Sequence, residues 1–81
     1  MNRGKAYKLA ALAAAHKTRA IILLKNGDHE GARKEEVAFL DRIEYIPGRL
    51  RQEIGPFLDA SVQIKLNTVG MERNSRQGLV K

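Results

Sequence analysis

The spacing of apolar residues predicts a helical hairpin at the start of the chain. From residue 3 to about residue 25, apolar positions recur every three or four residues in a stretch rich in Ala, Leu and Lys, which are strong helix formers. Asn26 and Gly27 end this pattern, because both tolerate the left-handed backbone that closes helices. Asp28 is a favourable N-cap for a second helix over residues 28–45.

A third segment begins after Pro47 and Gly48 and covers about residues 49–67. The residue before a proline disfavours helical backbone, so the second helix should stop there. One face of the third segment follows the helical spacing; its members are Leu50, Ile54, Phe57, Ser61 and Ile64. Pro56 removes a backbone hydrogen bond and should kink or restart the helix.

Residues 62–66 also fit a strand, since Val62, Ile64 and Leu66 alternate with polar residues. The helix is favoured because a single strand would have nothing in this chain to pair with. Residues 70–81 contain two glycines, and they are expected to form a short flexible basic C-terminal tail.

The predicted fold is all-α. Short connections make neighbouring helices antiparallel, so the three segments should form a helical hairpin or a three-helix bundle. A chain of 81 residues has room for one domain. We therefore expect a single helical domain over residues 1–69 with helices at about 3–25, 28–45 and 49–67, followed by the tail over residues 70–81.

The first predicted helix is apolar on two sides. One stripe is expected to face the core: Ala6, Leu9, Leu12, Ala13, His16, Ala20, Leu23 and Leu24. A second stripe lies on the opposite side: Tyr7, Ala11, Ala14, Thr18 and Ile22. A helix with two apolar sides is normally buried on both. We predict that the second stripe binds a protein partner or a second copy of the chain; the alternative is that the third helix covers it.

The chain carries a net charge of +6, and residues 1–27 hold six basic residues and no acidic one. Candidate phosphate contacts follow from this charge: Arg3, Lys8, Lys17, Arg19, Lys25, Arg73 and Arg76. Nucleic-acid binding through them would be independent of sequence and strongly dependent on salt. The basic residues of the first helix, however, flank its apolar stripes in two groups instead of forming one face.

Residues suited to catalysis or metal binding are sparse. The chain has no cysteine and only two histidines, His16 and His29, so no metal site or cofactor is predicted. Glu35 and Glu36 flank the apolar stripe of the second helix, where ion pairs to the first helix are a better explanation than acid-base chemistry. There is no glycine-rich phosphate loop and no nucleophile beside a base. We therefore expect neither an enzyme nor a small-molecule substrate.

The absence of cysteine fits a reducing compartment and thus an intracellular, cytoplasmic protein. No apolar run approaches the ~20 residues of a membrane span, so no membrane partner is expected. The sequence indicates a small non-enzymatic accessory protein, such as an inhibitor, adaptor or assembly factor, that docks on a protein or self-associates through helix faces. The alternative is a basic helical nucleic-acid-binding protein.

Overall fold

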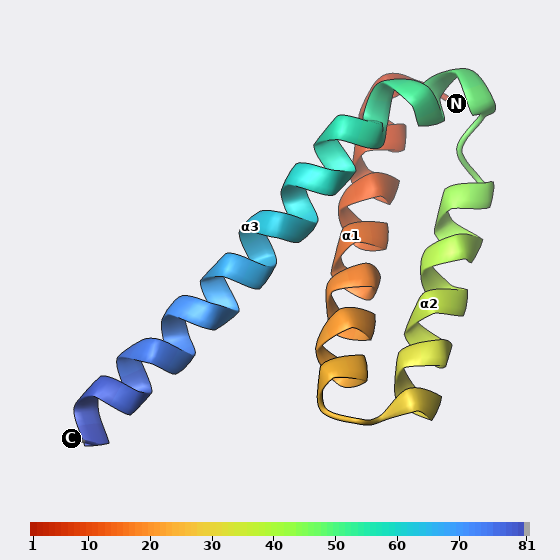
Figure 1. The fold of residues 1–81 in the computed structure, drawn as a ribbon. Coiled ribbons are helices and arrows are strands. Elements are labelled where there is room, and N and C mark those ends of the chain that lie inside the picture. The colour runs from red at the N-terminus through yellow and green to blue at the C-terminus, as the bar shows by residue number, and fades with distance from the viewer. Residues whose placement is uncertain (81) are drawn as a thin grey trace.

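The protein is all-helical in the computed structural model, which describes the backbone of residues 1–80 and the side chains of residues 1–70 (Figure 1). It contains three helices, α1 (Arg3–Lys25), α2 (His29–Glu44) and α3 (Gly48–Val80), and no strand within residues 1–80. The predicted all-α class is confirmed. Residues 62–66 lie within α3, so the strand alternative for this segment is wrong.

Side chains cap the starts of the first two helices. The Asn2 carboxamide oxygen accepts a hydrogen bond from the Lys5 backbone N–H at 2.8 Å. The Asp28 carboxylate accepts one from the Gly31 backbone N–H at 2.9 Å, as the N-cap prediction requires. Each cap satisfies a backbone donor that has no partner within the helix, and so fixes the residue at which the helix begins.

Gly27 closes the turn between α1 and α2 with a φ of +86°, which L-residues rarely adopt. Gly27→Ala should lower the free energy of unfolding by about 1–2 kcal/mol through backbone strain alone, since no atom lies within 4 Å of the added Cβ. Gly55→Ala is the matched control. Its Cβ also meets nothing within 4 Å, but Gly55 is helical, so alanine should stabilise the fold by about 0.5–1 kcal/mol. Urea unfolding of both variants measures the difference, and equal effects would contradict the argument.

The third helix is longer than the sequence predicts. It continues past Asn67, and Pro56 lies inside it without ending it, so both the predicted end and a restart at Pro56 are wrong. Figure 1 shows the first turns of α3 crossing above the hairpin and the later turns descending away from it. The predicted flexible basic tail covers residues 70–81 and includes Arg73 and Arg76; from residue 71 on, the side chains lie outside the described part of the chain.

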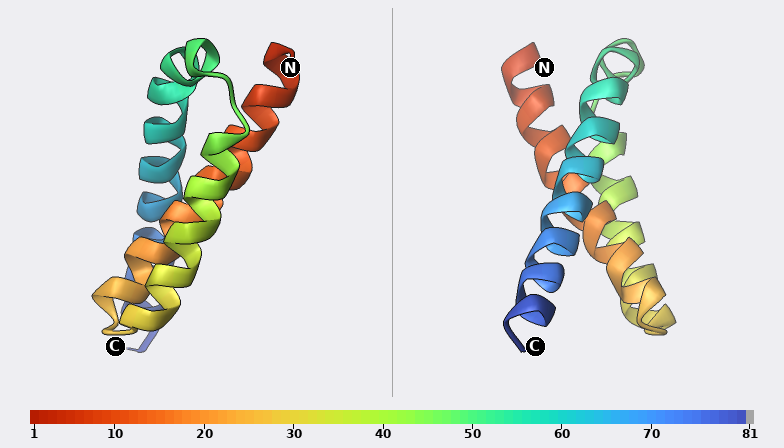
Figure 2. Two further views of the ribbon diagram at one scale, coloured as in Figure 1. Left: turned by 90° about the vertical axis from the view of Figure 1, so that its right-hand side faces the viewer. Right: turned by 60° about the vertical axis from the view of Figure 1, so that its left-hand side comes forward.

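The first helix is the centre of the fold. It packs against both α2 and α3, whereas α2 and α3 hardly touch each other. In Figure 2 α2 runs back alongside α1 after the short turn, and α3 crosses α1 as the two arms of an X. Near the chain's N-terminus α3 covers the hairpin, whereas near the α1–α2 turn it lies beside Ile22 and Lys25 of α1 instead of over the joint between α1 and α2.

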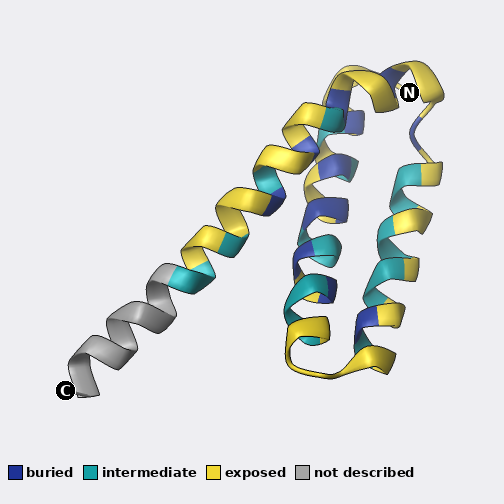
Figure 3. Cartoon of the chain, in the orientation of Figure 1, coloured by how far each residue is buried: buried dark blue, intermediate teal, exposed yellow. Residues whose placement is uncertain are grey.

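The core joins small side chains of α1 to large ones of α3 and the preceding turn. The α1 contribution is a set of fully buried alanines: Ala6, Ala10, Ala13 and Ala14. Against them pack Ile46, Leu50, Ile54, Leu58 and Val62. Figure 3 shows this buried band on α1 and α3. At its edge the Tyr7 and Phe57 rings meet edge to face, with centroids 5.0 Å apart. Alanine at these positions lets α3 lie close to the α1 backbone.

Candidate partner-binding site

The second apolar stripe of α1 faces α3 in the structure. Ala14 and Thr18 are buried, while Tyr7 and Ile22 are half-buried and Ala11 is exposed. Tyr7 contacts Phe57, and Ile22 lies beside Leu66 and Val69 of α3. The structure therefore agrees with the alternative stated above, in which the third helix covers the second stripe. Partner binding through it stays a prediction and would require α3 to move away.

The first stripe of α1 is covered only in part. Ala6, Ala13 and Ala20 are buried as expected, but Leu12 is 48% exposed and Leu24 is 54% exposed. The expectation that the whole stripe faces the core is therefore wrong for these two leucines. Leu24 lies in the last turn of α1, next to the turn into α2.

Polar contacts join α1 to α2 along one edge of their interface. The His16 ring Nδ1 lies 2.6 Å from a Glu35 carboxylate oxygen. The Lys17 ammonium donates to both carboxylate oxygens of Glu36, at 2.9 and 3.0 Å, and lies 5.1 Å from the centre of the Phe39 ring. The predicted ion pairs of Glu35 and Glu36 with the first helix are confirmed.

The Lys17–Glu36 pair should contribute a small measurable coupling. Both side chains are a little over one-third exposed, so solvent screens the charges of the pair. A double-mutant cycle of Lys17→Met and Glu36→Gln should therefore give a coupling free energy of about 0.5–1 kcal/mol. The Lys34–Glu30 pair is the control, because its atoms are 3.9 Å apart and both side chains are far more exposed. A cycle there should give at most about 0.5 kcal/mol. Equal couplings for the two pairs would contradict this.

Internal pairing changes the distribution of basic charge on α1. Arg3 pairs with Glu53 of α3 at 3.0 Å and Lys17 pairs with Glu36, so two of the candidate phosphate contacts are already engaged. Arg19 is largely exposed and reaches Glu35 only at 3.9 Å. Lys8 and Lys25 are exposed, with no ion pair among the residues whose side chains are described. Arg73 and Arg76 lie outside those residues.

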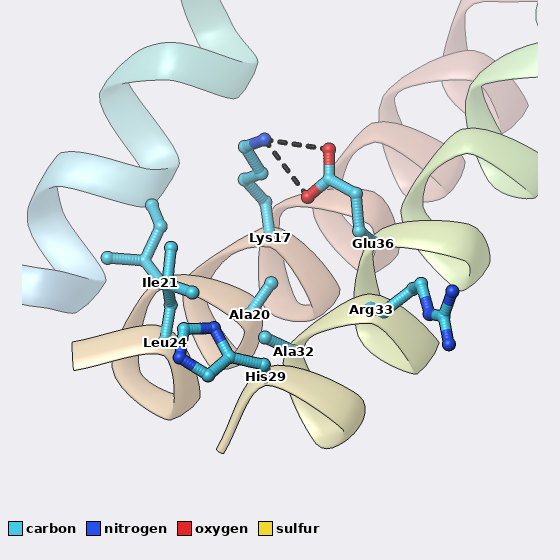
Figure 4. A pocket seen from close by; sticks show the side chains of 8 residues that line it. All are labelled: Lys17, Ala20, Ile21, Leu24, His29, Ala32, Arg33 and Glu36. Atoms are coloured by element: carbon cyan, nitrogen blue, oxygen red, sulfur yellow. Dashed lines mark hydrogen bonds and ion pairs between the residues drawn. The ribbon is translucent and has the colours of Figure 1, made fainter. Parts of the chain in front are cut away.

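A groove of about 400 Å³ lies between α1 and α2 near their connecting turn (Figure 4). Its surface is mainly apolar and is formed by Ala20, Ile21 and Leu24 of α1 and Ala32 of α2. Ala20 and Ala32 are buried where the two helices meet, and Leu24 remains more than half exposed. The groove is open because α3 flanks this end of α1 on another side, where Leu66 and Val69 line a smaller pocket with Ile22.

Charged side chains line the rim of this groove. Lys17 and Glu36 form their ion pair at one end, and Figure 4 shows the Arg33 guanidinium directed outward from α2. His29 lies at the other end, beside Leu24. Since the charges of Lys17 and Glu36 cancel, Arg33 supplies the net formal charge of the lining. An apolar floor with a cationic edge is suited to recognising an amphipathic surface and holds no nucleophile with a base.

Sequence reasoning missed this groove because it assigned Ala20 and Leu24 to the core. Both residues follow the helical spacing of the first stripe, and that spacing does not reveal where a third helix stops covering its neighbours. The exposed position of Leu24 depends on the crossing of α3 over α1, which is a tertiary property.

Within the described side chains, no group of three or more His, Cys, Asp or Glu residues is arranged to hold a metal ion. No helix in the described part of the chain is both long and apolar enough to span a membrane. In comparisons with known proteins, no family model, no curated protein and no solved structure matches the chain.

Proposed function

We propose that this protein is a small non-enzymatic accessory factor, acting as an adaptor, inhibitor or assembly component that docks on a protein partner through its helix faces. The observation that carries the proposal is the groove at the turn end of the hairpin, where Leu24 is 54% exposed beside Ile21 and Ala32. An apolar groove with a polar rim is the usual form of a site that receives a partner's side chains.

The polar groups around the groove support binding better than catalysis. The Lys17 ammonium and the Glu36 carboxylate satisfy each other, so neither is positioned to exchange a proton with a substrate. His29 is exposed and lies at the edge of the groove. The pairing of these groups with each other instead favours a rigid surface that a partner contacts.

Affinity capture from the native host tests the proposal. The wild-type chain, Leu24→Glu and Leu12→Glu are each used as bait, with and without nuclease. We expect a protein that co-purifies with wild type and Leu12→Glu after nuclease treatment and is lost with Leu24→Glu. Leu12 is a matched control because it is an equally exposed leucine on the same helix, outside the groove. If the same protein co-purifies equally with wild type, Leu24→Glu and Leu12→Glu, docking at the groove is contradicted.

Sequence-independent nucleic-acid binding is the second candidate. Its support is the charge on α1 that internal pairing leaves exposed, at Lys5, Lys8 and Arg19. Of the other basic group on α1, Arg3 and Lys17 are paired, and Lys25 is exposed with no ion pair among the described side chains. The double substitution Lys8→Glu and Arg19→Glu should abolish binding to duplex DNA at low salt, and wild-type affinity should fall steeply as salt rises. No wild-type binding at low salt would remove this candidate.

A further inference from the structure

We propose that the groove receives a short amphipathic helix of a partner protein, with apolar residues on one side and acidic residues flanking them. The proposal rests on the docking function above and names the chemistry of the partner. Three features of the structure carry it: the length of the groove, its place on the helix pair, and the charge of its rim.

The groove has the length of a short helix. It extends along α1 from Lys17 to Leu24, which corresponds to about 10 Å or two helical turns. A docked helix spanning two turns presents apolar side chains at positions i, i+4 and i+7, the spacing by which helices bind grooves. The volume of about 400 Å³ accommodates a few such side chains.

The groove continues the surface on which α3 already packs. Near the N-terminus, α3 lies against the small α1 residues Ala10 and Ala14. Farther along, the small residues Ala20 and Ala32 form the floor, and α3 lies on another side of α1, beside Ile22. Small side chains allow the backbone of a third helix to approach closely. The turn end of the hairpin therefore offers small side chains like those of the other end, and no α3 side chain within residues 1–70 lines its floor.

The rim selects an acidic partner. Lys17 and Glu36 neutralise each other, and Arg33 is exposed, with no ion pair among the residues whose side chains are described. The chain as a whole carries +6, which attracts an acidic protein over long distances and speeds its association. A carboxylate next to the apolar anchors of a partner helix would meet the Arg33 guanidinium.

Titration with two stapled helical peptides of about 14 residues tests the partner class. One peptide carries Leu at i, i+4 and i+7 with Glu at flanking positions, and the other has Lys in place of each Glu. Two-dimensional NMR of the labelled full chain should show the acidic peptide shifting amide signals of residues 17–24 and 29–36. The basic peptide should bind about tenfold more weakly or worse.

Three variants make the test specific. Leu24→Glu should lower the affinity for the acidic peptide by about tenfold or more, because the apolar contact is lost and the new carboxylate repels the peptide. Arg33→Glu should remove the preference for the acidic over the basic peptide. Leu12→Glu should leave the affinity unchanged. Thermal melts of the three variants check that each is folded at the temperature of the titration.

Several outcomes would overturn the proposal. Equal affinity for the two peptides would exclude an acidic helix as the preferred partner. NMR signal shifts confined to residues outside the groove would exclude the groove as the binding site. Light scattering that shows a wild-type dimer, dispersed by Leu24→Glu, makes a second copy of this chain the occupant. If a native protein is still captured through Leu24 while the acidic peptide fails to bind, the docking function stands and only the partner class is wrong.

Discussion

Replacing Ile54 with alanine should leave much of the protein unfolded at room temperature. Ile54 is 1% exposed and packs in the cluster that joins α3 to the buried alanines of α1. Removing a buried isoleucine to alanine costs about 2–5 kcal/mol, because apolar contact is lost and a cavity remains. A domain of this size rarely has more than about 3–5 kcal/mol of stability in total. The loss is therefore comparable with the whole free energy of unfolding.

Urea unfolding followed by circular dichroism measures this effect. Ile64→Ala is the matched control, because Ile64 lies on the same helix and is 65% exposed. The control should change the free energy of unfolding by at most about 0.5 kcal/mol. Similar losses for the two variants would show that α3 does not stabilise the hairpin through the Ile54 face, and would contradict the packing described above.

Local signals in the sequence predict the elements of the fold well. The turn at Gly27 and the N-cap at Asp28 depend on residues within a few positions of each other, and the structure confirms both. The pairing of Glu35 and Glu36 with α1 also followed from local spacing, since antiparallel helices joined by a short turn bring facing flanks together. These features need no knowledge of where α3 lies.

The course of α3 could not be predicted in this way. A proline inside a helix costs about 3 kcal/mol by intrinsic propensity, which made Pro56 look like an end or a restart. Leu58 and Val62 follow it and are buried in the core, so tertiary packing holds the helix through this position. The crossing of α3 over α1 then decides two further properties: the second stripe of α1 is covered, and Leu24 is exposed.

The arrangement of charge depends on the same tertiary contacts. In the sequence, Arg3 and Lys17 look as available to a phosphate as Lys8 does. Only the folded chain shows that Arg3 reaches Glu53 of α3 and Lys17 reaches Glu36 of α2. Pairing between residues far apart in the chain thus leaves Lys8, Arg19 and Lys25 as the more available of the predicted phosphate contacts on α1.

Enlarging Ala14 should push α3 away from α1. Ala14 is fully buried between the two helices, and its carbonyl accepts a hydrogen bond from the Thr18 hydroxyl at 2.8 Å. Ala14→Leu adds volume where the helices are in close contact and should lower the free energy of unfolding by about 1–3 kcal/mol. Ala11→Leu is the matched control: Ala11 is exposed on the same helix, so the change should stay within about 0.5 kcal/mol. Urea unfolding measures both, and loss of the NMR contact between the Tyr7 and Phe57 rings reports whether α3 has moved.

The same variant distinguishes the two docking surfaces. The face of α1 that includes Thr18 and Ile22 is accessible to a partner only when α3 moves away. If that face binds the partner, a folded Ala14→Leu chain with a displaced α3 should capture more partner than wild type, whether or not Leu24 is intact. If the groove binds the partner, capture should scale with the folded fraction and should still be lost with Leu24→Glu. Among the residues whose side chains are described, none of α3 lines the groove, so the second result is the one we expect.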